Sequence, residues 1–222
     1  MIRYAKKHHI YIMVSTNAQM LNEKLAKELV ESGLDKLIIS VDGLTQESYE
    51  QYRIGGKLQK TLDGMAHVAL WKKKLKTPTP HVEMQCLRLK TNEHEWGKFK
   101  DEYRNLGADS LTFKTAQFYD FENGNSLMPT DTKYARYRQS SNGKWQLKKQ
   151  LKNRCWRLWS GAVVDVAGNV RPCCFDKSGV FIFGNIKHNT FSEVWRNEKS
   201  KQFRKKILKN RASIEMCRNC SS

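Results

Sequence analysis

Apolar and polar positions alternate in blocks along the first 115 residues. Short apolar runs, which predict strands, lie at 10–14, 37–41, 81–89 and 110–114. Longer amphipathic segments, which predict helices, lie between them at 21–32, 58–75 and 93–106. Strands that alternate with helices are typical of right-handed βαβ units and a parallel sheet. We therefore expect an α/β fold in this part of the chain.

The pattern changes after residue 115. Residues 116–150 are mostly polar and predict a linker or a substrate-facing segment. Two short extended runs, 162–166 and 170–173, flank Gly168-Asn169 and predict a β-hairpin, and an amphipathic helix is expected over 191–208. These patterns divide the chain into three parts, which are 1–115, 116–150 and 151–222.

Polar side chains lie where the first two predicted strands end. Asn17 follows the first strand and Ser40 lies within the second. In parallel α/β folds the carboxyl ends of the strands form the edge at which ligands bind. The alternative is that these residues cap the turns that follow the strands. The pattern alone leaves both interpretations open.

The chain is strongly basic, with a formal net charge of +18. Such a charge attracts nucleic acid, anionic membranes or acidic substrates. Lysines occur on most predicted helices and do not form one stripe, which favours a solvated basic surface. No apolar run approaches the roughly 18 residues of a membrane span, and no signal peptide is evident. We therefore expect a cytoplasmic protein without a membrane partner, in which clustered cysteines indicate a metal rather than disulfides.

Four of the six cysteines occur in the C-terminal part of the chain at spacings that suggest a metal site: Cys155, Cys173, Cys217 and Cys220. The last two form a C-x-x-C pair, and the predicted hairpin brings the first two together. Four thiolates can hold zinc or an iron–sulfur cluster, and spacing alone does not separate these. Cys174 is adjacent to Cys173 and is expected to face the core instead. Cys86, alone in a strand, is expected to be a buried small residue.

These cysteine motifs resemble the SPASM/twitch module that follows radical S-adenosylmethionine enzymes and holds an auxiliary iron–sulfur cluster. The resemblance lies in Cys155-Trp156, AGNVRPCC at 167–174, FGNI at 183–186, FSEVW at 191–195 and the closing C-x-x-C. Weaker matches to the family's barrel lie upstream, in STN at 15–17, ISVDG at 39–43, Tyr52-Arg53 and NEHE at 92–95. Together they cover nearly the whole chain.

The resemblance implies a fold, cofactors and residue roles. The fold would be a partial (β/α)6 barrel whose first units are missing, followed by a small hairpin-and-helix module. The four cysteines would bind a [4Fe–4S] cluster. Ser40 and Arg53 would hold the carboxylate of S-adenosylmethionine, because a planar guanidinium pairs bidentately with carboxylates. Asn17 would lie near the ribose or methionine part, and Asp42 would cap the turn at Gly43.

One motif of that family does not occur in this sequence. Its radical chemistry needs a C-x-x-x-C-x-x-C loop near the start of the barrel, and only Cys86 precedes residue 155 here. The sequence is therefore expected to begin at the third βα unit. We expect that the chain alone does not cleave S-adenosylmethionine, and that it binds this cofactor only where the missing units are supplied.

Two functions follow from these features. The first is the cluster-binding portion of a radical enzyme that modifies a peptide, protein or sugar and exchanges electrons with an external donor. The second is a zinc-stabilised module that binds nucleic acid, supported by the basic charge and the cysteine quartet. The first is favoured, because Trp156, Trp159, Phe175 and Trp195 occupy expected core positions rather than an exposed nucleic-acid surface.

Overall fold

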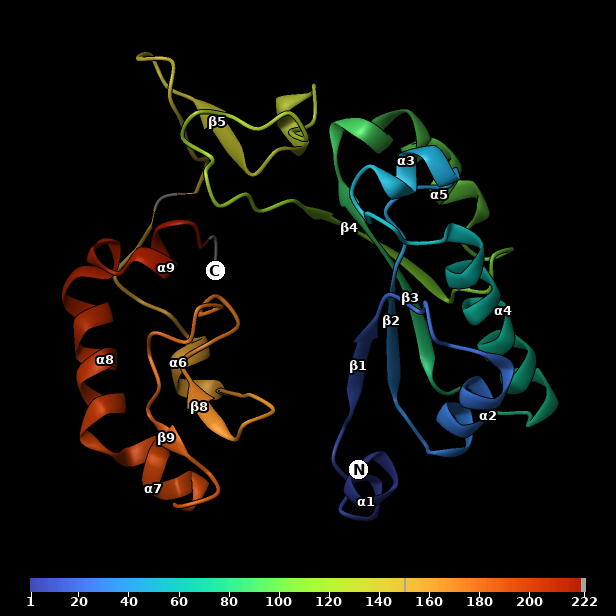
Figure 1. Cartoon of the computed structure of the whole chain (residues 1–222), viewed down its shortest axis with the longest axis horizontal. Coiled ribbons are helices and arrows are strands. Elements are labelled where there is room, and N and C mark those ends of the chain that lie inside the picture. Colours follow the sequence, from blue (N-terminus) through green and yellow to red (C-terminus); the bar gives the residue numbers. More distant parts are fainter. Residues whose placement is uncertain (150, 221–222) are drawn as a thin grey trace. The chain divides into compact units, whose positions relative to one another are not determined.

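The computed structural model describes residues 1–149 and 151–220. The chain divides into two compact units, Met1–Trp145 and Gln146–Ser222. Figure 1 follows the chain from one unit to the other. The boundary places most of the polar segment 116–150 with the first unit.

The first unit contains the predicted parallel sheet. Its strands are β1 (Met13–Thr16), β2 (Lys36–Ser40), β3 (His81–Arg88) and β4 (Ser110–Thr115), hydrogen-bonded in that order. Each neighbouring pair is parallel, which confirms the expected α/β class. β1 lies later than the predicted 10–14. The chain before it is held by Asp35, whose carboxylate accepts hydrogen bonds from the Ile12 amide and the Lys6 ammonium.

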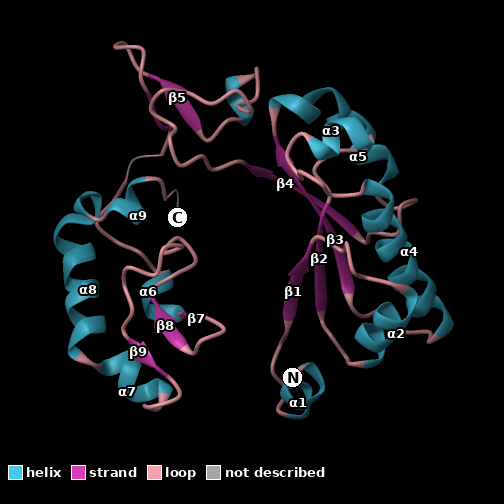
Figure 2. Cartoon of the chain, in the orientation of Figure 1, coloured by secondary structure: helices cyan, strands magenta, loops and turns pink. Residues whose placement is uncertain are grey.

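Helices connect these strands, as Figure 2 shows. They are α1 (Ile2–Lys7), α2 (Glu23–Glu31), α3 (Gln46–Glu50), α4 (Leu58–Lys74), the 3-10 turn η1 (Lys90–Glu95) and α5 (Trp96–Glu102). The helix predicted over 93–106 is thus shorter and begins as η1. The Asn92 side chain is the reason, because it accepts from the Leu89 amide and donates to the carbonyl oxygens of Asp42 and Leu87.

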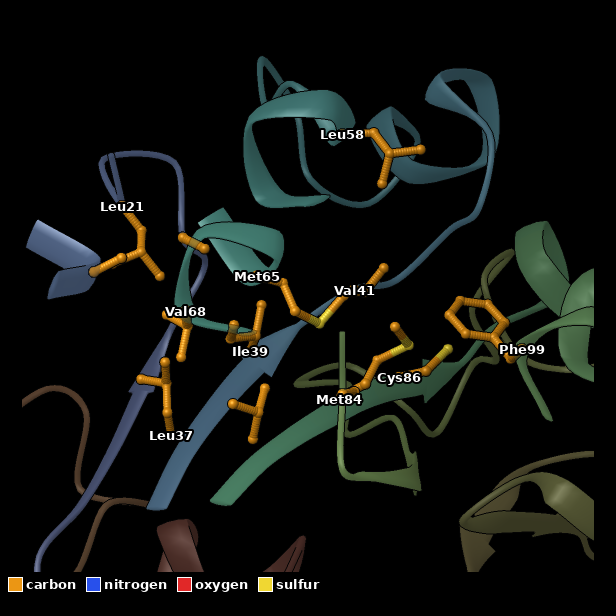
Figure 3. Packing of buried hydrophobic residues seen from close by; sticks show 14 of the residues in the cluster. Leu21, Leu37, Ile39, Val41, Leu58, Met65, Val68, Met84, Cys86 and Phe99 are labelled. Carbon is orange, nitrogen blue, oxygen red and sulfur yellow. The ribbon is translucent and has the colours of Figure 1, made fainter. Parts of the chain in front are cut away.

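The core of the first unit lies between the sheet and its helices. Leu37 and Ile39 of β2 and Met84 and Cys86 of β3 pack against Met65 of α4, and all five side chains are fully buried (Figure 3). These residues alternate along each strand, so one face of the sheet is apolar and covered by helices. The carboxyl edge of the sheet is therefore supported by a packed core.

The segment 116–150 is not only a linker. It contains the turn η2 (Thr132–Tyr134) and the two-stranded sheet formed by β5 (Tyr137–Gln139) and β6 (Trp145–Leu147). The buried Tyr137 hydroxyl accepts a hydrogen bond from the Phe118 amide, and its ring stacks on Phe121. These contacts give a polar sequence a defined local structure.

The second unit combines a small antiparallel sheet with helices. The sheet is formed by β7 (Val163–Val164), β8 (Asn169–Arg171) and β9 (Gly184–Asn185). The predicted hairpin about Gly168-Asn169 is present as β7–β8. The helical elements are α6 (Arg157–Ser160), α7 (Phe191–Arg196), α8 (Glu198–Asn210), the turn η3 (Arg211–Ser213) and α9 (Glu215–Arg218).

The single helix predicted over 191–208 is wrong, because Asn197 separates α7 from α8. Asn197 adopts an extended conformation and its side-chain oxygen accepts a hydrogen bond from the Ser200 amide. Its side-chain nitrogen donates to the Phe183 carbonyl oxygen. An asparagine that caps a new helix and also anchors a neighbouring segment overrides the amphipathic pattern.

The aromatic side chains around α6 differ from expectation. Trp156 and Trp159 do not lie in the core, since they are 79% and 42% exposed. Helix α6 is only four residues long, and it directs Leu158 into the core instead. Phe175 and Trp195 are half-buried, which is closer to the predicted core positions.

Candidate metal centre

Four cysteines of the second unit line one cavity. They are Cys155, Cys173, Cys217 and Cys220. The cavity is otherwise lined mainly by apolar side chains, among them Leu158, Phe203, Ile207 and Met216. The fold therefore brings the predicted cysteine quartet together. Its first and last members, Cys155 and Cys220, are 65 residues apart in the sequence.

Short local structures aim each thiol toward this cavity. Cys155 precedes α6, and its carbonyl oxygen accepts a hydrogen bond from the Leu158 amide at 3.2 Å. Cys173 follows β8, at the end of the hairpin. Cys217 lies in α9, and Cys220 follows one turn later with its amide 3.0 Å from the Cys217 carbonyl oxygen. A hairpin, a helical turn and a C-x-x-C turn thus supply the four thiols.

Burial favours the protonated form of two of these thiols, Cys173 and Cys217. It raises the pKa of Cys173, and nearby cysteines add to this effect. It also raises the pKa of Cys217 to about 11, while the Arg211 guanidinium acts in the opposite direction. Metal ligation requires thiolates, so binding must displace these protons.

The donor set fits an iron–sulfur cluster. Within the described residues, no three His, Cys, Asp or Glu side chains lie close enough together to hold a single metal ion. A tetrahedral zinc site requires sulfur atoms about 3.8 Å apart, given a Zn–S distance of about 2.3 Å. In a cluster each thiolate binds a different iron, so the sulfurs lie farther apart. The four-thiol cavity encloses about 10 Å³, roughly the room for one water.

The two remaining cysteines differ in their surroundings. Cys174 is exposed and does not line the four-thiol cavity, so the expectation that it faces the core is wrong. Adjacent positions point to opposite sides, and here the side opposite Cys173 is open to solvent. Cys86 is fully buried, as expected, and desolvation raises the pKa of its thiol.

Sequence reasoning missed Arg211, which lines the same cavity and is only 2% exposed. Its guanidinium donates a hydrogen bond to the Arg154 carbonyl oxygen, and it lies near enough to Cys217 to lower the pKa of that thiol. An arginine in a very basic sequence carries no special signal. Only the position of Arg211 just after α8, close in sequence to the C-x-x-C pair, indicates that this arginine could lie near the cysteines.

In the first unit, the predicted strand-end residues lie at the carboxyl edge of the sheet. Ser40 ends β2, and Asn17 follows Thr16, which pairs with Ile39. Asn17 therefore lies level with Ser40 on the neighbouring strand. The Asn17 side chain accepts a hydrogen bond from the Gln19 amide, so it also stabilises the turn that follows.

Arg53 is fixed at this edge by Asp42. The Arg53 Nε atom donates to Asp42 Oδ2 at 2.6 Å, and Asp42 Oδ1 accepts from the Leu87 amide at 2.7 Å. Asp42 is 1% exposed, and burial raises the pKa of its carboxyl group while Arg53 opposes this effect. Asp42 therefore positions Arg53 and the end of β3, rather than capping the Gly43 turn as expected.

Residues 155–221 match the family model of SPASM, an iron–sulfur cluster-binding domain. This segment is similar to SPASM domains. The match contains all four cysteines of the cavity and confirms the predicted resemblance and the predicted iron–sulfur cofactor. It supports the first of the two functions and gives no support to a zinc-stabilised nucleic-acid module.

Several known proteins are similar to the chain. An S-adenosyl-L-methionine-dependent 2-deoxy-scyllo-inosamine dehydrogenase of Niallia circulans is 39% identical over 62 residues, which are 28% of the chain and 25% of that protein. The tungsten-containing aldehyde ferredoxin oxidoreductase cofactor-modifying protein of Pyrococcus furiosus is 23% identical over the whole chain and 68% of its own length.

The solved structures support the fold. The structure of a histidine-tagged anSMEcpe with bound AdoMet matches 95% of the chain with a TM-score of 0.61 at 19% identity. The chain spans 61% of the length of that protein and 25% of the length of the dehydrogenase. Within the described residues, no helix is long and apolar enough to cross a membrane.

Proposed function

We propose that this chain is the cluster-binding portion of a radical S-adenosylmethionine enzyme, with residues 1–115 as a partial barrel and 151–222 as its SPASM module. The observation that carries the proposal is the four-thiol cavity, formed by side chains distant in sequence and contained in the SPASM domain. The parallel sheet of β1 to β4 is consistent with part of a (β/α)6 barrel.

The proposed ligands of a [4Fe–4S] cluster are Cys155, Cys173, Cys217 and Cys220. Cys173 is preferred to Cys174 because Cys173 lines the cavity and Cys174 is exposed outside it. The apolar wall, with Leu158 and Ile207, limits the access of water to the site. When bound, such a cluster supplies one-electron redox chemistry or an iron that can bind substrate.

The proposed cofactor residues of the first unit are Asn17, Ser40 and Arg53. Asp42 engages only Nε of Arg53, and within the described residues no hydrogen bond occupies the two terminal guanidinium nitrogens or the Ser40 hydroxyl. These donors are available to a carboxylate such as that of S-adenosylmethionine. Because the sequence contains no C-x-x-x-C-x-x-C, this chain by itself is not expected to cleave the cofactor.

The proposed substrate is a peptide, protein or sugar, and an external donor is expected to deliver electrons. The similar proteins include a 2-deoxy-scyllo-inosamine dehydrogenase, a cofactor-modifying protein and a GTP 3',8-cyclase. The names of these proteins refer to different substrates. The substrate class proposed for this chain therefore rests on the SPASM resemblance alone.

Anaerobic reconstitution tests the cluster. The full chain is loaded with iron and sulfide, and its iron, sulfide and zinc contents and visible absorption are measured. We expect about four iron atoms per chain, lost in Cys155→Ala and Cys173→Ala. The matched controls Cys174→Ala and Cys86→Ala are expected to keep the iron.

Two results would count against this function. A colourless protein that takes one zinc ion and no iron contradicts the cluster. Tight binding of RNA or DNA that weakens steeply with salt would favour the nucleic-acid module instead.

A further inference from the structure

Arg211 is the largest fully buried side chain among the described residues. It begins η3, directly after α8, and lines the cavity that the four cysteines share. Burying a guanidinium removes it from water at high cost, and buried charges are therefore normally paired. Arginine does not escape this cost by losing its proton. A buried guanidinium in the wall of the four-thiol cavity thus suits a site that carries negative charge.

The surrounding contacts hold the guanidinium against the thiols. The Arg211 amide donates to Asn153 Oδ1 at 2.9 Å, and Nη1 donates to the Arg154 carbonyl oxygen at 2.8 Å. The guanidinium also lies near the Cys217 thiol, whose pKa it lowers. Both Asn153 and Arg154 immediately precede Cys155 in the chain. Arg211 therefore joins the segment that carries one proposed ligand to the helical turn that carries another.

Two other arginines of this unit, Arg157 and Arg204, differ from Arg211 in their burial or in their position relative to the four-thiol cavity. Arg157 also lines the four-thiol cavity, but it is exposed, so solvent screens its charge. Arg204 of α8 is partly buried and donates to the carbonyl oxygens of Leu158 and Trp195, but it does not line the cavity. Arg211 alone among these three combines burial with the cavity wall.

We propose that Arg211 is a built-in counter-ion of the cluster, which raises the reduction potential of the cluster. This inference rests on the proposed function, because it requires a cluster on the four cysteines. Reduction adds one electron and hence one negative charge to the site. A fixed cation in a water-poor cavity stabilises the reduced state more than the oxidised state.

The test is a redox titration of the reconstituted full chain, followed by electron paramagnetic resonance. We expect Arg211→Gln to lower the reduction potential clearly below that of the unaltered chain. Arg211→Lys retains the charge and is expected to lie between the two. Arg157→Gln and Arg204→Gln are the matched controls. Arg157 lines the four-thiol cavity but is exposed, whereas Arg204 is partly buried but does not line it. Both variants are expected to change the reduction potential less than Arg211→Gln does.

The outcomes separate this inference from the proposed function. An unaltered chain that binds no cluster contradicts the proposed function itself. A loaded Arg211→Gln variant with an unchanged potential overturns the counter-ion role. If Arg211→Gln fails to load, loading of Arg211→Lys supports charge compensation. Failure of both variants, with native circular dichroism, contradicts it, because lysine retains the charge.

Discussion

Ile207 links the stability of the second unit to its cluster. This side chain of α8 is 1% exposed, belongs to the core of the unit and lines the four-thiol cavity. Ile207→Ala removes three buried carbon atoms. Transfer of these atoms alone accounts for about 2.4 kcal/mol, at about 0.8 kcal/mol per group. The cavity left behind brings the expected loss to about 2–5 kcal/mol.

That loss is large for a unit of this size. A small domain seldom obtains more than about 3–5 kcal/mol from its core alone. The cluster-free Ile207→Ala variant is therefore expected to leave the second unit largely unfolded. The loaded variant is expected to stay folded, because a structural metal site contributes free energy of folding directly.

Urea unfolding followed by tryptophan fluorescence measures this effect, with and without cluster. The matched control is Leu208→Ala, the next residue of the same helix, whose side chain is 53% exposed. A surface change of this kind is expected to cost within about 0.5 kcal/mol. Equal losses for the two variants would refute the packing argument, and an equally unfolded loaded variant would refute the stabilising role of the cluster.

Three further predictions test other parts of the molecule. Asp42→Ala leaves Arg53 and the Leu87 amide without their partner. This change should lower the free energy of unfolding of the first unit by about 3–5 kcal/mol in thermal or urea denaturation. An unchanged unfolding midpoint would contradict the role of the ion pair. Asn92→Ala removes the amide group that donates to two carbonyl oxygens. It should lower the free energy of unfolding by at least about 2 kcal/mol in the same assay. A loss of less than about 0.5 kcal/mol would contradict this role. Since the folded pKa of Cys217 is raised to about 11, the cluster-free protein holds its proton more tightly than the unfolded chain, so stability should fall between about pH 9 and 11 by roughly 1–3 kcal/mol. Cys217→Ser should reduce this pH dependence in urea titrations, and an identical slope would assign it to other groups.

Local sequence patterns predicted most of the fold. The alternation of apolar runs with amphipathic segments was sufficient for the parallel sheet, because apolar side chains at a strand or helix period must be buried on one face. The predicted helix boundaries were wrong where a polar side chain forms a hydrogen bond with the backbone. Asn197 divides a predicted helix into α7 and α8, and Asn92 shortens another. Such bonds depend on which distant groups are near, and no periodicity reveals them.

The candidate site was only partly accessible to sequence reasoning. The spacing of Cys217 and Cys220 and the hairpin before Cys173 predicted converging thiols, because C-x-x-C turns and hairpins are local structures. Cys173, which the sequence favoured over Cys174, lies in the cavity wall, but the exposure of Cys174 was not foreseen. Which side of a two-stranded hairpin faces solvent depends on what packs against it.

The sequence by itself determined the class of the sheet and the four cysteines that we propose as sulfur donors, since both follow from residue types and their spacing. Only the tertiary structure decided that Arg53 is held by a buried Asp42 and that Arg211 lies among the thiols. The physical reason is that a charged side chain has no fixed role along the chain. Its role is set by the burial and by the partners that folding provides, and these come from residues far away in sequence.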